Sequence, residues 1–179
     1  MRIAYADPPY MGCGKYYPEK KEIDYVDLIY KLENDYDRWA LSCHVPSLHQ
    51  ILNLCPEEVR VGAWVKPWCS FKAANPAYCW EPVIFVTGLK HGKGHETVRD
   101  FIIANQTRQK GLTGAKPIEF CVWILKMLGV QQEDVFDDLY PGTNIMEKAK
   151  KLYFASNVLF GEKERKSNGK VQRVWTDTE

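Results

Sequence analysis

Strand-forming and helix-forming patterns alternate along this chain, and the alternation constrains the fold more than any other feature. Short runs rich in apolar, β-branched and aromatic residues predict strands at 2–6, 39–43, 59–65, 77–86 and 134–140. Amphipathic patterns predict helices from Asp24, from Pro46, over 117–128 and from after Asn144 to about Leu152. Such alternation is typical of an α/β sandwich with a mostly parallel sheet, which is the fold class we predict.

Length and composition favour one domain with a charged tail. The chain has 179 residues, of which 45% are hydrophobic and 26% charged, as in ordinary globular proteins. We expect a single domain over residues 1–160 and a mobile hairpin or disordered tail over 161–179. The formal net charge is only +1, so contact with a nucleic acid must depend on a local basic patch. No apolar run is long enough to predict a membrane span.

The cysteines do not suggest a metal centre. None of the six belongs to a C-x-x-C pair or to a Cys/His cluster with zinc-ligand spacing; they are Cys13, Cys43, Cys55, Cys69, Cys79 and Cys121. The sequence starts directly on a predicted strand, without a signal peptide. We therefore expect reduced thiols in a cytoplasmic protein that binds no metal.

The first predicted strand ends in Asp7-Pro8-Pro9-Tyr10, a tetrapeptide that suits one kind of chemistry. Asp7 can accept one N–H of an amine on a flat heteroaromatic ring, and the Pro8 carbonyl can accept the other. The two proline rings stiffen this backbone and remove competing N–H donors. Both acceptors favour the positive charge that grows on the nitrogen during methylation, and Tyr10 offers a face for stacking. A plain turn, with Asp7 capping a helix, is the alternative.

A second turn follows the last predicted strand. Its residues are Asp138, Tyr140, Pro141, Gly142, Thr143 and Asn144. Open α/β sheets bind ligands at the carboxyl ends of strands, where a glycine-containing turn enters a helix. Gly142 lets a ligand approach the backbone, and Thr143 and Asn144 suit its hydroxyl or carboxylate groups. An ordinary strand–helix junction, with Asp138 capping the helix, is the alternative.

Together the two turns resemble the amino methyltransferases that use S-adenosylmethionine (SAM), over roughly residues 1–150. The resemblance implies that Asp7, Pro8, Pro9 and Tyr10 form the catalytic loop. It also implies a SAM site made by Asp7 and by the second turn: Asp138, Tyr140, Pro141, Gly142, Thr143 and Asn144. Residues 112–120, with Lys116-Pro117-x-Glu119 at their centre, resemble the segment that this family places just before the cofactor strand, which adds Lys116 to the implied cofactor site.

The order of these motifs narrows the resemblance. A catalytic loop that precedes the glycine turn is the permuted order of the β-class DNA N6-adenine methyltransferases and of the eukaryotic messenger-RNA adenosine methyltransferases. The implied fold is a three-layer, Rossmann-like methyltransferase fold with circularly permuted motif order. The compact length and the runs at 64–68, 80–83 and 114–117 look most like small phage and actinobacterial proteins of this group. This resemblance implies a location in the cytoplasm of a bacterial cell or of a phage-infected host.

The resemblance implies methyl transfer from SAM to N6 of adenine in DNA, with the base flipped out or taken from a single strand. Transfer to RNA adenine N6 or to cytosine N4 stays open, as does a non-catalytic scaffold of the same fold that binds nucleic acid. No segment is long enough for a separate recognition domain. We therefore expect either a short recognition sequence or target recognition supplied by a partner subunit or by a second copy in a homodimer.

Two positions depart from the pattern of this family. Asn144 replaces the second glycine of the turn. The family also has an acid, which binds the cofactor ribose, at the end of the following strand. The candidate for that strand is 152–157, and it ends in Ser156 and Asn157.

The segment 90–110 holds the best local basic patch. We predict phosphate contacts from its Lys90, Lys93, Arg99 and Arg108, with a solvated loop as the alternative. Lys66, at the end of the third predicted strand, is a further candidate for nucleic-acid contact. Glu81 stands inside an apolar run, so it must either be paired or face a site.

Overall fold

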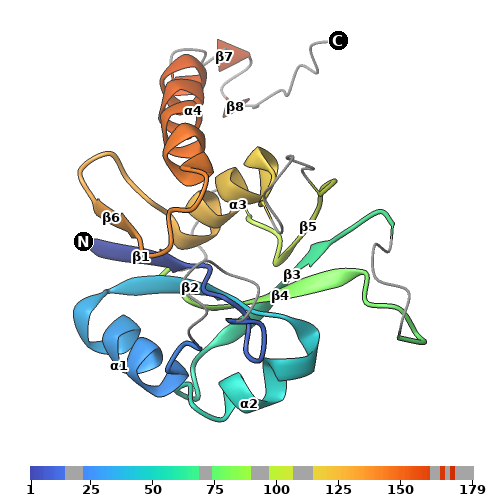
Figure 1. Ribbon diagram of the computed structural model, residues 1–179. Coiled ribbons are helices and arrows are strands. Elements are labelled where there is room, and N and C mark those ends of the chain that lie inside the picture. The colour runs from blue at the N-terminus through green and yellow to red at the C-terminus, as the bar shows by residue number, and fades with distance from the viewer. Residues whose placement is uncertain are drawn as a thin grey trace.

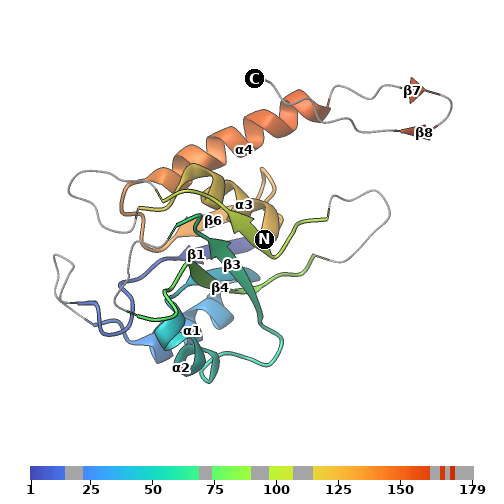
Figure 2. The same ribbon diagram turned by 90° about the vertical axis from the view of Figure 1, so that its right-hand side faces the viewer.

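A computed structural model of the protein describes residues 1–14, 22–68, 74–89, 97–106, 115–161, 166–167 and 170–171. A six-stranded sheet lies between two layers of helices (Figure 1). Helices α3 (Ile118–Leu128) and α4 (Ile145–Gly161) cover one face of the sheet, and α1 (Tyr25–Asp35) and α2 (Leu48–Leu52) cover the other, as the view in Figure 2 also shows. The predicted α/β sandwich is confirmed.

The strand order in the sheet is β5-β3-β4-β2-β1-β6. The bounds are Arg2–Ala6 for β1, Arg38–Ser42 for β2, Arg60–Val65 for β3, Trp80–Val86 for β4, Phe101–Ile103 for β5 and Val135–Asp138 for β6. Strand β1 pairs in parallel with β2 and β6, and β3 pairs in parallel with β5. Only β4 runs antiparallel to its neighbours, β2 and β3. The sheet is therefore mostly parallel, as predicted.

The helix ends follow local chemistry that the sequence shows. The carboxylate of Asp24 caps α1 by accepting from the backbone N–H groups of Val26 and Asp27, at 2.9 and 3.2 Å. Helix α3 follows Pro117 and ends at Gly129, whose φ of +63° is the left-handed conformation that glycine adopts without strain. A short 3₁₀ turn, Val45–Ser47, leads into α2.

Each face of the sheet has its own apolar core. Ile3, Trp64, Phe85, Phe120 and Leu125 are among the buried side chains between the sheet and α3 and α4. On the opposite face, the core contains residues of α1 and α2 and of the adjoining strands, among them Leu28, Leu32, Trp39, Ile51 and Ile84. Burial on both faces explains why β1 and β2 read as continuous apolar runs rather than as alternating patterns.

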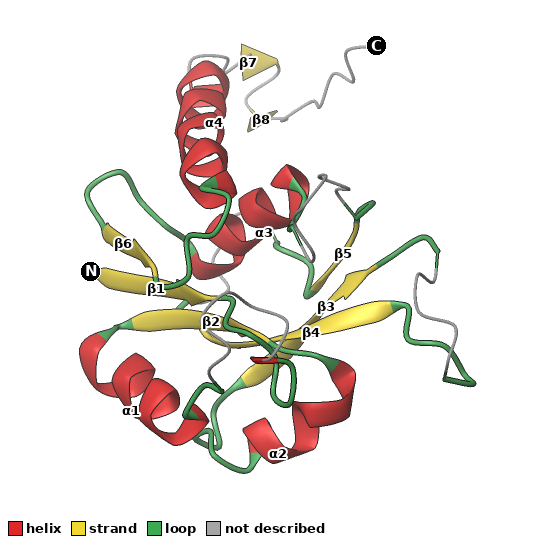
Figure 3. Cartoon of the chain, in the orientation of Figure 1, coloured by secondary structure: helices red, strands yellow, loops and turns green. Residues whose placement is uncertain are grey.

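One predicted element is wrong. Residues 152–157, interpreted above as a strand, belong to helix α4 (Figure 3). The buried side chains of α4 include Met146, Ala149 and Tyr153, a spacing of three and four residues that places them on one helix face against α3. The family pattern places a ribose contact at the end of a strand, but in this protein the corresponding residues 152–157 are helical. In the tail, β7 (Lys166–Ser167) pairs antiparallel with β8 (Lys170–Val171).

The cysteines differ in part from expectation. Cys13, Cys43, Cys55 and Cys121 are free thiols, whereas Cys79 is disulfide-bonded, so the expectation that all thiols are reduced fails at this residue. Among the described helices, none is both long enough and apolar enough to span a membrane.

Candidate active site

The two turns singled out above lie side by side at one edge of the sheet. We call Asp7–Tyr10 the proline turn and Asp138–Asn144 the glycine turn. Strands β1 and β6, which precede them, are parallel neighbours, with Tyr5 opposite Asp138. The backbone N–H of Leu139 also donates to the carbonyl of Tyr5, at 2.9 Å. The sheet pairing therefore brings the two turns next to each other.

The reversed direction of β4 adds a third group to this edge. Because β4 is antiparallel to its neighbours, its first residues lie at the carboxyl ends of β2 and β3. Glu81 pairs in register with Trp64, so it lies close to Lys66, the residue that follows β3. Glu81 is thus brought to the proline turn by the sheet topology, although it is 74 positions from Asp7 in sequence (81 − 7).

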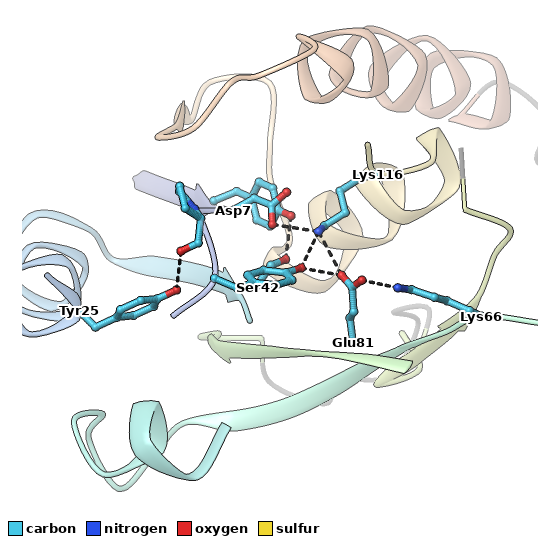
Figure 4. Close-up of polar contacts among 9 residues, drawn as sticks. Asp7, Tyr25, Ser42, Lys66, Glu81 and Lys116 are labelled. Atoms are coloured by element: carbon cyan, nitrogen blue, oxygen red, sulfur yellow. Dashed lines mark hydrogen bonds and ion pairs between the residues drawn. The ribbon is translucent and has the colours of Figure 1, made fainter. Parts of the chain in front are cut away.

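These residues form a charged cluster around Lys116, whose side chain is 6% exposed (Figure 4). The Lys116 ammonium contacts Oδ1 of Asp7 at 2.9 Å and Oε2 of Glu81 at 3.2 Å, and it donates to the Tyr10 hydroxyl at 2.9 Å. The ammonium of Lys66 pairs with the other oxygen of Glu81. The structure therefore joins Lys116, predicted as a cofactor ligand, directly to the proline turn.

Several contacts hold the proline turn in place. The Tyr10 hydroxyl donates to Oε2 of Glu81 at 2.6 Å, and the Tyr25 hydroxyl of α1 donates to the Pro9 carbonyl at 3.1 Å. The Tyr10 ring stacks on His44, with centroids 5.4 Å apart and planes 16° from parallel. One face of Tyr10 is therefore already occupied by a ring, and a base that stacks on Tyr10 must use the other face or displace His44.

Burial and pairing shift the pKa values of the two acids in this cluster, Asp7 and Glu81, in opposite directions. Burial raises the pKa of Asp7 although Lys116 acts to lower it. Burial also acts to raise the pKa of Glu81, but the ammonium groups of Lys116 and Lys66 outweigh it and lower this pKa to about 2. Lys116 is itself buried, which acts to lower its pKa, yet the two carboxylates raise that pKa well above its ordinary value. Glu81 and Lys116 are both charged at neutral pH.

The glycine turn contains two residues with positive φ: Gly142 at +39° and Asn144 at +55°. Asparagine is among the side chains that tolerate the left-handed region best. Asn144 can therefore adopt the left-handed conformation at the position where the family that the sequence resembles has a glycine. Among the described residues, a Cβ added to Gly142 would meet only the carbonyl oxygen of Tyr140, at 3.8 Å, so these residues leave the space beside this turn open.

Asp138 gives the glycine turn a negative charge that depends on pH. Its carboxylate accepts from the backbone N–H of Tyr140 at 3.2 Å. Burial, with a smaller contribution from the charge of Asp7, raises the pKa of Asp138 to about 6. At neutral pH the glycine turn thus presents a carboxylate at this edge of the sheet, which favours a positively charged ligand.

Two of the five candidate phosphate contacts, Arg99 and Lys66, lie within the described residues. Arg99 is exposed, and its guanidinium lies 5.9 Å from the centre of the Phe101 ring. Lys66 is 12% exposed and paired with Glu81 inside the cluster. Lys90, Lys93 and Arg108 lie outside the described residues. Within the described ranges, no group of three or more His, Cys, Asp and Glu side chains is placed to hold a metal ion.

The sequence pattern missed part of the site. Tyr25 and His44 contact the proline turn, but nothing in their local sequence distinguishes them from ordinary core and loop residues. Glu81 did carry a signal, because an acid within an apolar run must be compensated. Its partners, however, come from three separate segments and could not be read from its own neighbours in sequence.

Comparison with known proteins supports the fold. No protein-family model matches the sequence, and no curated protein matches it. The fold is similar to that of M1.HpyAVI in a complex with SAM, with a TM-score of 0.60 and 16% identity over 86% of this chain and 78% of that one. A second M1.HpyAVI structure gives a TM-score of 0.54 and 12% identity over 86% and 76%. The chain thus has a methyltransferase fold; the permuted motif order stays a prediction.

Proposed function

We propose that the protein transfers the methyl group of SAM to N6 of adenine in DNA. The observation that carries the proposal is the adjacency of the two turns, because β1 and β6 bring Asp7 and Asp138 to the same edge of the sheet. The M1.HpyAVI complex with SAM, which has a similar fold, supports the choice of cofactor. The substrate class is what the resemblance of the two turns to DNA N6-adenine methyltransferases implies.

The glycine turn fits SAM in charge and in space. SAM carries a sulfonium and an ammonium group, and the Asp138 carboxylate offers them a partner at neutral pH. The open space beside Gly142 admits a ligand close to the backbone. Thr143 and Asn144 come directly before α4, which begins at Ile145, and helix N-terminal N–H groups favour a carboxylate. When bound, SAM supplies an activated methyl group as an electrophile.

The proline turn provides the groups that act on the amine. Asp7 accepts one N–H of the adenine amine, and the Pro8 carbonyl accepts the other, so that the nitrogen lone pair is directed at the methyl group. As the N–C bond forms and the S–C bond breaks, positive charge moves from sulfur to nitrogen, and the Asp7 carboxylate stabilises it. The methylated nitrogen then releases one proton to solvent. Neither step requires a covalent intermediate with the protein.

The direct test is transfer of a tritium-labelled methyl group from SAM to mixed DNA and RNA, followed by nucleoside analysis. We expect N6-methyladenine in DNA. A product on cytosine N4 would replace the adenine assignment, and methylation confined to RNA would replace the DNA assignment. Tight binding of a polymer without any transfer would show that the protein is a non-catalytic scaffold.

The raised pKa of Asp138 predicts a pH-dependent affinity for SAM. Asp138 is ionised above pH 6 and neutral below it, since its pKa is about 6. The attraction between this carboxylate and the cationic cofactor is therefore present at pH 7.5 and is lost as the pH falls through 6 toward 5. We expect the affinity to fall about tenfold over this range, as for the loss of one charged hydrogen bond. Calorimetric titration with SAM at several pH values measures the change.

Asp138→Asn is the matched control for this prediction. The amide keeps the size of the side chain but does not titrate, so the variant should bind SAM weakly and with little pH dependence between 5 and 7.5. A wild-type affinity that is flat across this range would show that Asp138 does not face the cationic part of the cofactor.

A further inference from the structure

Glu81 has more bonding partners in the charged cluster than its place in the proposed reaction explains. Glu81 accepts a hydrogen bond from Tyr10 and forms ion pairs with Lys66 and Lys116. These three partners belong to separate segments of the chain. Its side chain is 15% exposed. A buried carboxylate is costly unless it is compensated, and each partner here compensates it while being fixed by it.

We infer that Glu81 is a positioning residue that shares Lys116 with Asp7 and thereby keeps the Asp7 carboxylate available to the substrate amine. The inference rests on the proposed function. Its geometric basis is the position of the Lys116 ammonium, 2.9 Å from Asp7 and 3.2 Å from Glu81 (Figure 4). The ammonium thus divides its charge between two acceptors of nearly equal distance.

The balance of charge shows why this sharing matters. The cluster holds two carboxylates, Asp7 and Glu81, against two ammonium groups, Lys66 and Lys116, so its formal charge is zero. Without the charge of Glu81, Lys116 would pair with Asp7 alone and the cluster would be positive. A positive cluster opposes the charge that grows on the amine nitrogen during transfer. Glu81 would therefore act on the rate of transfer, through Lys116, without touching the substrate.

Glu81 also fixes the ring of Tyr10. The Tyr10 hydroxyl donates to Glu81 at 2.6 Å and accepts from Lys116 at 2.9 Å, so both of its bonding roles are taken within the cluster. The ring itself packs against His44. Together these contacts fix the direction of the proline turn, where a base would be held.

The test is Glu81→Gln, which keeps an acceptor for Tyr10 and removes the charge. We expect kcat to fall about 10- to 100-fold, the factor that corresponds to one charged hydrogen bond, while the KM for SAM changes little. Adding Lys66→Gln returns the cluster to formal neutrality and should recover most of the lost rate. Glu57→Gln, the same change at an exposed position, is the matched control and should leave kcat unchanged.

A purely structural role predicts a different pattern. In that case the double variant would be slower than Glu81→Gln, because two sets of contacts are lost instead of one, and this result would overturn the inference. An unchanged kcat in Glu81→Gln would overturn it as well. Thermal melting of each variant shows whether the fold is retained.

A titration of the Asp7 carboxyl by carbon-13 NMR separates this inference from the proposed function. The charge of Glu81 raises the pKa of Asp7, and Lys116 lowers it. Glu81→Gln removes the first effect and strengthens the second, so the pKa of Asp7 should fall in the variant whether or not the protein is an enzyme. If the wild type transfers no methyl group, the proposed function is wrong, and this titration alone decides whether Lys116 is shared. An unchanged pKa would show that it is not.

Discussion

Replacing Asp7 with alanine should lower kcat for methyl transfer about 10- to 100-fold and should weaken SAM binding much less. The removed carboxylate is most valuable when the amine is positively charged, which happens only as the methyl group is transferred. A hydrogen bond to a charged group is worth about 1.5–3 kcal/mol, and each ~1.4 kcal/mol corresponds to one factor of ten in rate. Single-turnover rates and calorimetry with SAM give the two quantities separately.

Asp7→Asn and Asp27→Ala complete this experiment. The asparagine keeps one acceptor oxygen without the charge, so its kcat should lie between those of the wild type and Asp7→Ala. Asp27 lies in the first turn of α1, away from the cluster, and its substitution should leave both quantities unchanged. Equal losses in SAM affinity and in kcat for Asp7→Ala would assign Asp7 to cofactor binding rather than to the chemistry.

The parts of the fold that the sequence predicts correctly are those with strong local determinants. The helices predicted from Asp24 and over 117–128 are found as α1 and α3. Their ends depend on backbone groups within a few residues, because Asp24 caps α1 and Gly129 ends α3. The strand predicted at 152–157 failed for the opposite reason. Leu152, Tyr153 and Phe154 form a local run that is typical of a strand, but the register of Met146, Ala149 and Tyr153 against α3 makes this segment helical.

In the candidate site, too, some features follow from the sequence and others do not. Each of the two turns follows a strand directly, so their positions at the sheet edge follow from the general behaviour of α/β folds. The charged cluster that contains Asp7 does not follow from the sequence. Glu81 reaches Lys116 only because β4 runs in the reversed direction. A strand pattern carries no information on direction, and Pro82 within β4 gave no indication of it.

In the glycine turn, a residue that departs from the family pattern adopts a conformation that suits glycine. Asn144 replaces the second glycine of the family pattern, and this departure, together with the missing ribose acid, keeps a non-catalytic scaffold open. Its φ of +55° shows that the turn requires a left-handed residue at this position, and asparagine meets the requirement at a small cost. The left-handed conformation of Asn144 is therefore one that a glycine at this position would also adopt without strain.

The second large effect is expected on stability. Lys116→Met should lower the free energy of unfolding at pH 7.5 by about 3 kcal/mol, toward the lower end of the range for removing one partner of a buried ion pair. The lower end applies because the Asp7 side chain is 21% exposed and Glu81 keeps Lys66 as a partner. Urea unfolding measures the loss, and Lys148→Met, at an exposed position, is the matched control with little expected effect.

The pH dependence of this loss identifies its cause. Without Lys116, the effect of burial and the nearby charge of Glu81 would raise the pKa of Asp7 further above its value in the unfolded chain. An acid whose pKa is raised in the folded state favours folding more as the pH falls, so the variant should regain stability between pH 7.5 and 5. Asp7→Asn added to Lys116→Met removes the uncompensated charge and should recover part of the loss at pH 7.5. If the double variant is no more stable than Lys116→Met, the loss arises from packing around the lysine chain and not from the carboxylate that it neutralises.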